Sequence, residues 1–158
     1  MGSHTGLDQD EKDRREIEAL LIRYATALDT RDWTLLESCF TPDATADYGQ
    51  LVGRHEGYPA IERTVRQALA SYTATQHLLS NFVIRVDGEE ATSVCQLRAS
   101  HYLPGVPGGE VAVVIGRYHD DLVKNASAWR IRQRRLEHAW REGNLEIFNV
   151  AAASRRPN

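Results

Sequence analysis

Two histidines, His77 and His101, are the side chains in this sequence best suited to acid–base chemistry. Each lies in a segment with strand-like alternation, TQHLLSN at 75–81 and CQLRASHY at 95–102. A histidine exchanges a proton near neutral pH, because its ordinary pKa is about 6.5. If a turn centred near Glu89 joins the two segments, the histidines lie roughly opposite each other. The spacing therefore predicts two imidazoles facing one space.

The period-two alternation of a strand also predicts which neighbours share that face. The first strand is expected to present His77, Leu79, Asn81 and Val83 there, and the second Cys95, Leu97, Ala99 and His101. We predict that Asn81 and Leu97 contact a bound substrate, and that Leu79 and Val83 form an apolar wall. A slip of one residue in the pairing would turn a whole strand to the opposite face.

Asp29 is a candidate partner for one of these imidazoles. It continues an apolar stripe through Leu21 and Ala25 at four-residue spacing, near the end of a predicted helix, where the helix dipole disfavours a carboxylate. A carboxylate buried beside an imidazole fixes the tautomer of the ring and stabilises its protonated form. Such a pair makes a general base. The pattern leaves open a second interpretation, in which Asp29 is a solvated acid at the helix end.

Three further side chains could contribute chemistry, but the sequence alone leaves their roles open. Tyr24 and Tyr48 can each pack in the core or present a hydroxyl to a substrate oxygen. Arg117 interrupts the apolar run VVIGRYHDD, where it can face solvent or steady an anionic group. The alternate arginines of RIRQRRLEHAWRE, residues 130–142, indicate a solvated face, and we assign no chemistry to His138 there.

Hydrophobic periodicity predicts the elements that position these residues. A helix is expected over about 10–29, with shorter helices over 32–40, capped by Asp32, and over 58–72. The second half of the chain alternates like strands. We expect a turn at 41–44, a short strand at 45–49, and long strands at 75–86, 91–103, 110–123 and 128–141. Helices followed by strands indicate an α+β fold, with the helices on one face of a curved, mainly antiparallel sheet.

The bulk properties indicate a single globular domain. The 158 residues are 42% hydrophobic and 26% charged, as in ordinary globular proteins. A net charge of −3 argues against a nucleic-acid partner, and no apolar run is long enough for a membrane span. The polar start lacks a secretory signal, so a cytoplasmic location is expected. We expect Cys39 and Cys95 to be buried free thiols, and the domain to span 11–150, between a disordered segment 1–10 and a flexible tail 151–158.

Four motifs in order, ALDTRDW, FTPDATADYG, TQHLLSN and CQLRASHY, resemble the SnoaL-like, scytalone dehydratase-like branch of the nuclear transport factor 2 superfamily. The resemblance covers residues from about 12 to 141. It implies a cone-shaped α+β barrel, in which three N-terminal helices close a strongly bent sheet over a deep pocket. It also implies a homo-oligomer, dimer or trimer, assembled through the outer face of the sheet.

The same resemblance implies roles for individual residues. Asp29 and His77 would form an acid–histidine dyad, with His77 as the base that abstracts a proton. His101 would match the second histidine of the dehydratases. Tyr48 would match a tyrosine that helps to polarise the substrate carbonyl through an ordered water.

Some positions depart from the pattern of the dehydratases. These differences argue against scytalone itself as the substrate. Leu28 stands where the dehydratases have a tyrosine directly before the acid. Gly116 and Tyr118 stand where a serine and an asparagine are expected. The expected substrate contacts are Tyr24, Leu28, Asn81, Leu97 and Arg117.

The leading hypothesis is a lyase of dehydratase type that needs no cofactor or metal and acts on a small, oxygenated, polyketide-like cyclic molecule. The same groups could instead drive a cyclisation or open an epoxide, because each reaction needs a base and a dry pocket. A third hypothesis is a non-catalytic ligand-binding module, which would not need an Asp–His pair. A fourth is an iron enzyme with two histidines and one aspartate as ligands, although Asp29 pairs more simply with His77.

Overall fold

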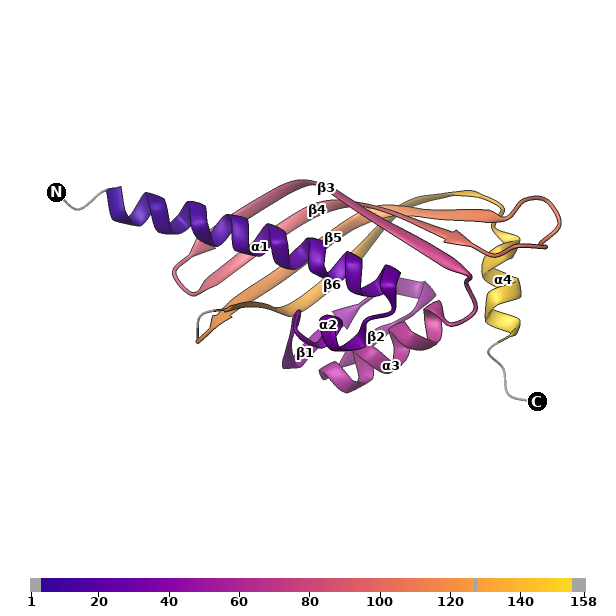
Figure 1. Ribbon diagram of the computed structural model, residues 1–158, viewed down its shortest axis with the longest axis horizontal. Helices are drawn as coiled ribbons and strands as arrows, with labels where there is room; N and C mark the ends of the chain where they lie inside the picture. The colour runs from indigo at the N-terminus through magenta and orange to yellow at the C-terminus, as the bar shows by residue number, and fades with distance from the viewer. Residues whose placement is uncertain (1–3, 127, 155–158) are drawn as a thin grey trace.

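A curved, open sheet of six strands forms the larger part of the molecule (Figure 1). The computed structural model describes residues 4–126 and 128–154. The strand order is β2-β1-β6-β5-β4-β3, in which only the β1–β6 pair is parallel among the described strands. The strands are β1 (Phe40–Asp47), β2 (Arg54–Glu56), β3 (Ala74–Asp87), β4 (Glu90–Tyr102), β5 (Val111–Asn125) and β6 (Ala128–Gly143).

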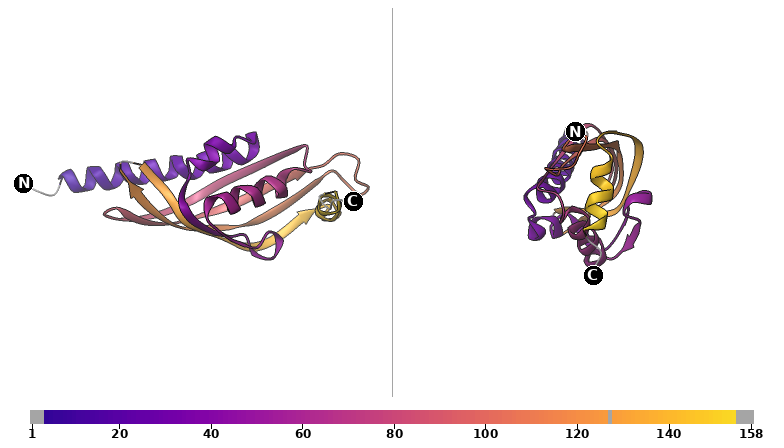
Figure 2. Two further views of the ribbon diagram at one scale, coloured as in Figure 1. Left: turned by 90° about the horizontal axis from the view of Figure 1, so that it is seen from below. Right: turned by 90° about the vertical axis from the view of Figure 1, so that its right-hand side faces the viewer.

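Helices cover one side of this sheet and one of its ends. In the described part of the chain they are α1 (His4–Thr30), α2 (Trp33–Glu37), α3 (Tyr58–Leu69), α4 (Glu146–Ala153) and the 3-10 helix η1 (Gly49–Leu51). The long helix α1 runs beside the long strands, α2 and α3 follow next to it, and α4 stands at the far end (Figures 1 and 2). This arrangement confirms the predicted α+β fold, with three N-terminal helices on a mainly antiparallel sheet.

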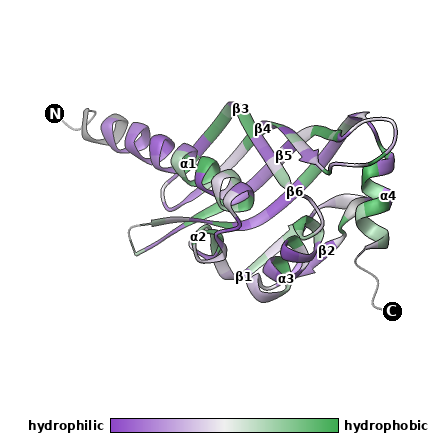
Figure 3. Ribbon diagram, turned by 45° about the vertical axis from the view of Figure 1, so that its right-hand side comes forward, coloured by the Kyte–Doolittle hydropathy of each residue, from purple (hydrophilic) through white to green (hydrophobic). Residues whose placement is uncertain are grey.

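The apolar stripe of α1 attaches the helix to the sheet. Ile17, Leu21, Tyr24 and Leu28 recur every three or four residues, and each is at most 3% exposed. Burial of such a side chain contributes about 1.5–3 kcal/mol by removing apolar surface from water. The first turns of α1 are hydrophilic and α4 is largely hydrophobic (Figure 3). The stripe therefore fixes the C-terminal half of α1, and with it Asp29, next to β3.

Most elements lie where the sequence predicts them. Each long strand begins and ends within two residues of its predicted bounds. Asp32 caps α2 as predicted, since its carboxylate accepts a hydrogen bond from the Leu35 backbone N–H at 2.8 Å. Residues 41–44 were predicted as a turn, but they belong to β1, whose pairing with β6 shifts register in this part.

Residues 4–10 and 151–153, near the two ends of the chain, differ from the prediction. The helix α1 begins at His4, so residues 4–10 are helical, and residues 151–153 form the end of α4. Residues 1–3 and 155–158 lie outside the described residues. None of the described helices is long and apolar enough to cross a bilayer.

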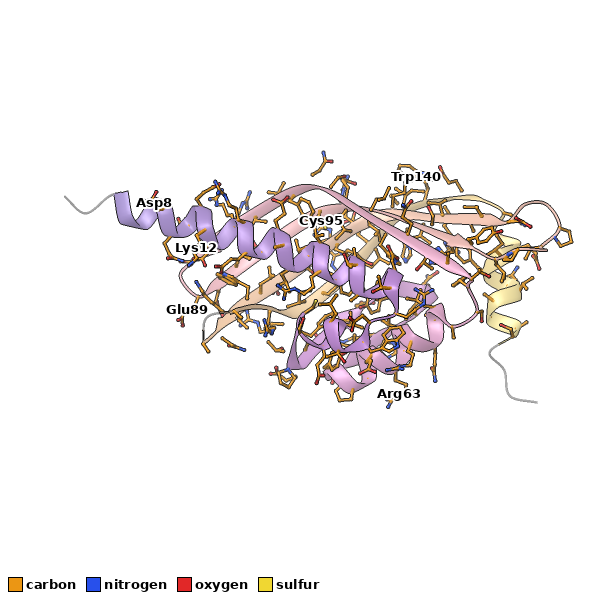
Figure 4. The ribbon with its side chains drawn as sticks, viewed as in Figure 1. Asp8, Lys12, Arg63, Glu89, Cys95 and Trp140 are labelled. Carbon is orange, nitrogen blue, oxygen red and sulfur yellow. The ribbon has the colours of Figure 1, made fainter. Side chains whose placement is uncertain are left out.

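The two cysteines are buried free thiols, as predicted. Cys95, near the middle of the sheet in Figure 4, is 1% exposed, and Cys39 is 0% exposed. Trp140, at the border of the molecule in the same view, is 58% exposed on the outer side of β6. The core therefore lies between the sheet and the helices, whereas the outer face of the sheet retains exposed apolar side chains.

A β-bulge in β3 changes which of its side chains face the helices. The pairing with β4 shifts by one residue between Ser80 and Val83, and Asn81 at the bulge has a φ of 54°. The extra residue reverses the alternation, so Phe82 and Ile84 turn inward while Asn81 and Val83 are exposed. The predictions that Asn81 contacts the substrate and that Val83 forms an apolar wall are therefore wrong.

His77 and His101 face the same side of the sheet without being directly opposite. The register pairs His77 with Ala99 and Thr75 with His101, two residues away from the predicted pairing. One residue of this offset comes from the position of the β3–β4 turn and one from the bulge. A shift of two residues preserves the face. The two rings therefore remain neighbours, with centroids 6.2 Å apart.

Candidate active site

Asp29 and His77 form a hydrogen-bonded pair where α1 meets β3. The Nδ1–H of His77 donates to Oδ1 of Asp29 at 2.6 Å, and the backbone N–H of His77 donates to Oδ2 at 2.8 Å. The His77 side chain is 6% exposed and that of Asp29 24%. Because Nδ1 carries the proton in this bond, the lone pair of the neutral ring lies on Nε2. Within the described residues, Nε2 has no hydrogen-bond partner.

A short relay of hydrogen bonds supports the Asp29 carboxylate. The Thr75 hydroxyl donates to Oδ1 at 3.0 Å, and Arg31 Nη1 donates to the Thr75 hydroxyl at 2.8 Å. Arg31 follows α1 with a φ of 58°, where glycine is usual, and its guanidinium also donates to the carbonyl of Leu28. Sequence reasoning missed both residues, although alternation along the strand places Thr75 on the same face as His77.

The surroundings of Asp29 keep it ionised. Burial raises the pKa of its carboxyl, but hydrogen bonds from the His77 ring, the His77 backbone and Thr75 together lower it more. The pKa therefore ends below its ordinary value. An ionised Asp29 stabilises the imidazolium that forms when His77 takes a proton. The pair has the geometry and the charge of a general base.

His101 lies beside the dyad in an aromatic setting. Its ring centroid is 4.8 Å from that of Tyr72 and 5.4 Å from that of Phe148. Burial, assisted by the nearby His77, lowers the pKa of His101 to about 4. The ring is therefore neutral near pH 7, and it can form hydrogen bonds without carrying a charge. Its Nδ1 is buried and has no partner among the described residues.

Tyr24 and Tyr48 bring two hydroxyl groups together between α1 and β1. Their oxygens are 3.1 Å apart, and both side chains are buried. Burial raises the pKa of Tyr48 well above its ordinary value, with smaller effects from Tyr24 and Tyr118 in the same direction and from Arg134 in the opposite one. A hydroxyl that keeps its proton can donate a hydrogen bond to an oxygen of a ligand.

A buried guanidinium lies next to these tyrosines and corrects the prediction for the last strand. Arg134 is 0% exposed and donates two hydrogen bonds of 2.7 Å to Asp120. Its Cζ lies 4.0 and 4.1 Å from the ring centroids of Tyr24 and Tyr118. Bidentate pairing and aromatic stacking offset the cost of burying the charge. A register shift earlier in β6 turns Arg134 inward, so residues 130–142 do not form one solvated face.

A cavity of about 310 Å³ between the sheet and the helices collects these side chains. This volume lies at the lower end of the range for small-molecule sites. Its polar lining includes Tyr24, Tyr48, His77, His101, His138 and Arg141. Leu28 and Leu97 line it as predicted, and together with Ala99 and Val114 they make much of its wall apolar.

Two predicted substrate contacts lie away from this cavity. Arg117 is on the outer face of β5, about half exposed, and its Nη1 donates to Glu137 at 3.4 Å. The prediction that Arg117 contacts the substrate is wrong, because Gly116 and Tyr118 take the inward positions on either side of it. Asn81 is exposed at the bulge of β3.

Sequence reasoning missed two residues of β6 that line the cavity, His138 and Arg141. The Nε2–H of His138 donates to the carbonyl of Tyr48 at 3.3 Å, while its Nδ1 is buried without a partner among the described residues. The pairing of β5 with β6 shifts register twice, once near each end of the run of arginines. A strict period-two count from the buried Ile131 therefore places His138 on the wrong face, whereas the second shift returns Arg141 to the face that the count gives.

Known proteins resemble this chain in sequence or in structure. An uncharacterized protein of Mycobacterium tuberculosis is 38% identical over 125 residues, which are 77% of this chain and 82% of that protein. The crystal structure of the Kfla4162 protein from Kribbella flavida has a TM-score of 0.80 at 27% identity, covering 88% of this chain and 98% of that one.

Two solved structures that carry enzyme names are also similar. A Novosphingobium aromaticivorans protein, provisionally described as a scytalone dehydratase, has a TM-score of 0.79 at 24% identity and covers 87% of this chain and 91% of that one. A hexachlorocyclohexane dehydrochlorinase from Novosphingobium barchaimii has a TM-score of 0.76 at 16% identity and covers 87% and 94%. At these identities the likeness shows the fold.

The family follows from a match that spans most of the chain. Residues 9–135 match the SnoaL-like domain. This range contains the helices α2 and α3, most of α1, and the strands β1 to β5. It also contains every residue of the dyad and its relay. The chain therefore belongs to the SnoaL-like domain family, as its four ordered motifs predicted.

Proposed function

We propose that the protein is an enzyme of dehydratase type, in which His77 removes a proton from a carbon next to a carbonyl of a small, oxygenated cyclic substrate. The Asp29–His77 pair carries this proposal. Asp29 occupies Nδ1 of His77, so Nε2 is left to accept a proton, and His77 lines the cavity. The fold supports it, since similar structures are named for the loss of water and of hydrogen chloride.

The proposed first step uses both nitrogens of His77. Nε2 accepts the proton of the substrate C–H bond, and the electron pair of that bond moves toward the carbonyl to give an enolate. Nδ1–H continues to donate to Asp29, whose negative charge balances the imidazolium. Asp29 itself takes no proton. Its hydrogen bonds to Thr75 and to the His77 backbone keep the ring oriented throughout.

Tyr48 is the proposed partner of the enolate oxygen, directly or through a water. Its hydroxyl is held 3.1 Å from that of Tyr24, and its raised pKa keeps the proton in place to be donated. The nearby positive charge of Arg134 favours negative charge on this side of the cavity. Donors fixed in advance toward developing charge are often the largest single contribution to catalysis.

The second step expels a hydroxyl group from the adjacent carbon. The enolate electrons form a C–C double bond, the C–O bond breaks, and the departing oxygen takes a proton from the His77 imidazolium, so one water leaves and the dyad is restored. The neutral ring of His101, 6.2 Å from His77 between centroids, can hold the departing hydroxyl through a hydrogen bond. With its pKa near 4, His101 is not a reservoir of protons near pH 7.

Deuterium exchange tests the base directly without knowledge of the natural substrate. In D₂O, the wild-type protein is expected to accelerate exchange of the α-hydrogens of cyclic ketones such as cyclohexanone and 2-tetralone, followed by proton NMR. His77→Gln should slow this exchange by a factor of about 10² or more, the usual contribution of a positioned general base. Asp29→Asn should also slow it, because the amide cannot balance the imidazolium.

His119→Gln is the matched control. His119 also lies on a long strand and also bonds a carboxylate, that of Glu137 at 2.7 Å, but it is on the outer face of the sheet. Its replacement should leave the exchange rate unchanged. Exchange by His77→Gln at the wild-type rate would contradict the proposal. Wild-type protein that binds these ketones without accelerating exchange would support a non-catalytic binding module instead.

A further inference from the structure

His77 and Arg141 occupy the two ends of one row of inward-facing residues that crosses the sheet. The register pairs His77 with Ala99, Ala99 with Val114, and Val114 with Arg141. All four side chains line the cavity. The row therefore has a base at one end, a guanidinium at the other, and two small apolar side chains between them.

Arg141 is the one permanently charged side chain in the cavity lining that the structure describes. None of the described lining residues is an aspartate or a glutamate. Arg141 forms no ion pair within the described residues, although most other arginines of β6 have polar partners. Its Cζ lies 5.8 Å from the ring centroid of Phe148 on α4, and the residue is exposed. A guanidinium without an ion-pair partner, at the rim of a cavity whose described lining has no carboxylate, is suited to bind an anion.

From this row we infer that the substrate carries an anionic group, bound by Arg141, at the end remote from the carbon that His77 deprotonates. The inference rests on the proposed function for the reacting end and adds the substrate class, an oxygenated cyclic acid. A carboxylate or a phosphate monoester has the required chemistry, since a guanidinium binds either through two hydrogen bonds.

The geometry also limits the size of this substrate. Neighbouring strands are about 4.8 Å apart, so three steps separate the two backbones by roughly 14 Å along the sheet. The side chains of His77 and Arg141 take up part of that distance from each end. What remains accommodates one or two rings lying on Ala99 and Val114, in agreement with a cavity of about 310 Å³. The anionic group is thus separated from the reacting carbon by the width of a ring system.

Binding of matched ligands tests the inference. The dissociation constants of 2-naphthoate and of its neutral analogue 2-naphthamide are measured by isothermal titration calorimetry at low salt. The wild-type protein should bind the carboxylate about tenfold or more tightly than the amide, as expected for hydrogen bonds to a charged group. Arg141→Gln should abolish this preference while leaving the affinity for the amide unchanged. Including 2-naphthyl phosphate distinguishes the source: tighter, Arg141-dependent binding of the phosphate would assign the site to a phosphate monoester.

Arg135→Gln is the control. Arg135 lies on the same strand as Arg141 and is exposed, and it stands opposite His119 of β5 on the outer face of the sheet. It should keep the wild-type preference. Equal wild-type affinity for acid and amide, an undiminished preference in Arg141→Gln, or no binding of either ligand would overturn the inference. His77→Gln separates the two proposals. If the preference for the carboxylate depends on Arg141 while His77→Gln still exchanges deuterium at the wild-type rate, the anion site is retained and the role of His77 as the base is refuted.

Discussion

Two acid–base pairs of this molecule, Asp120–Arg134 and Asp29–His77, differ in what they leave unbonded. In the Asp120–Arg134 pair both side chains are 0% exposed and joined by two hydrogen bonds, and the one nitrogen without a partner among the described residues, Arg134 Nη1, is a donor buried outside the cavity lining. In the Asp29–His77 pair the carboxylate is 24% exposed, and one ring nitrogen has no partner among the described residues. The first pair is a closed ion pair inside the core. The second keeps a lone pair available to a ligand.

The difference follows from the elements that supply the residues. Asp120 and Arg134 lie on the adjacent strands β5 and β6, where direct pairing holds both backbones at a fixed distance. Asp29 comes from the end of a helix and His77 from an edge strand, so their contact closes the gap between two layers. A pair between layers can border a cavity, whereas a pair within a sheet is enclosed by its neighbours.

Removal of the Asp120 carboxylate should have the largest effect on stability. Asp120→Ala leaves the Arg134 charge buried and unpaired, which is expected to cost about 3–5 kcal/mol of unfolding free energy. Urea denaturation measures this loss. In a double variant that also carries Arg134→Met, much of the stability should return, since an apolar pair of similar volume avoids the buried charge. If Asp120→Ala were as stable as the wild type, the Asp120–Arg134 ion pair would not be the structural element described above.

The corresponding change in the other pair should affect activity more than stability. Asp29→Asn is expected to slow ketone deuterium exchange by about 10²–10⁴-fold, because the ring loses its charge balance and its favoured tautomer. The free energy of unfolding should fall by only about 1 kcal/mol, since the amide can still accept the backbone hydrogen bond. Proton NMR and urea denaturation measure the two quantities on one sample. Equal losses of stability in Asp29→Asn and Asp120→Ala would remove the contrast between the pairs.

His101 should make stability depend on pH in a defined direction. Its folded-state pKa of about 4 lies below the ordinary 6.5, so the unfolded chain binds a proton first as the pH falls. The contribution of neutral, buried His101 to the free energy of unfolding is therefore fully present above about pH 6.5. It is lost as the pH falls toward 4. The shift corresponds to at most about 3 kcal/mol. His101→Phe should flatten the pH dependence of unfolding in urea over this range, and an unchanged slope would contradict the assignment.

Much of this organisation could be predicted from the sequence, and most of the failures share one physical cause. Helix periodicity placed Asp29 at the end of α1, and the long strands placed His77 and His101 on one face. Residues after a bulge were misplaced, because one inserted residue reverses a period-two pattern and leaves no mark in composition. The sequence therefore places Asn81 inside and Arg134 outside, and the structure shows the reverse. The wrong prediction for Arg117 has a different cause. The sequence pattern of its strand is compatible with either face, and only the strand pairing decides between them.

The bulge itself can be tested at Asn81, with the smallest expected effect. Its φ of 54° is tolerated by asparagine but disfavoured by a β-branched side chain. Asn81→Val should therefore lower the free energy of unfolding by about 1 kcal/mol, although valine favours ordinary strands. Ketone exchange should not change, because Asn81 is exposed and outside the cavity lining. Ser80→Val, one residue earlier, is the control. If Asn81→Val were the more stable of the two, β3 would run without the bulge and Asn81 would return to the face of His77.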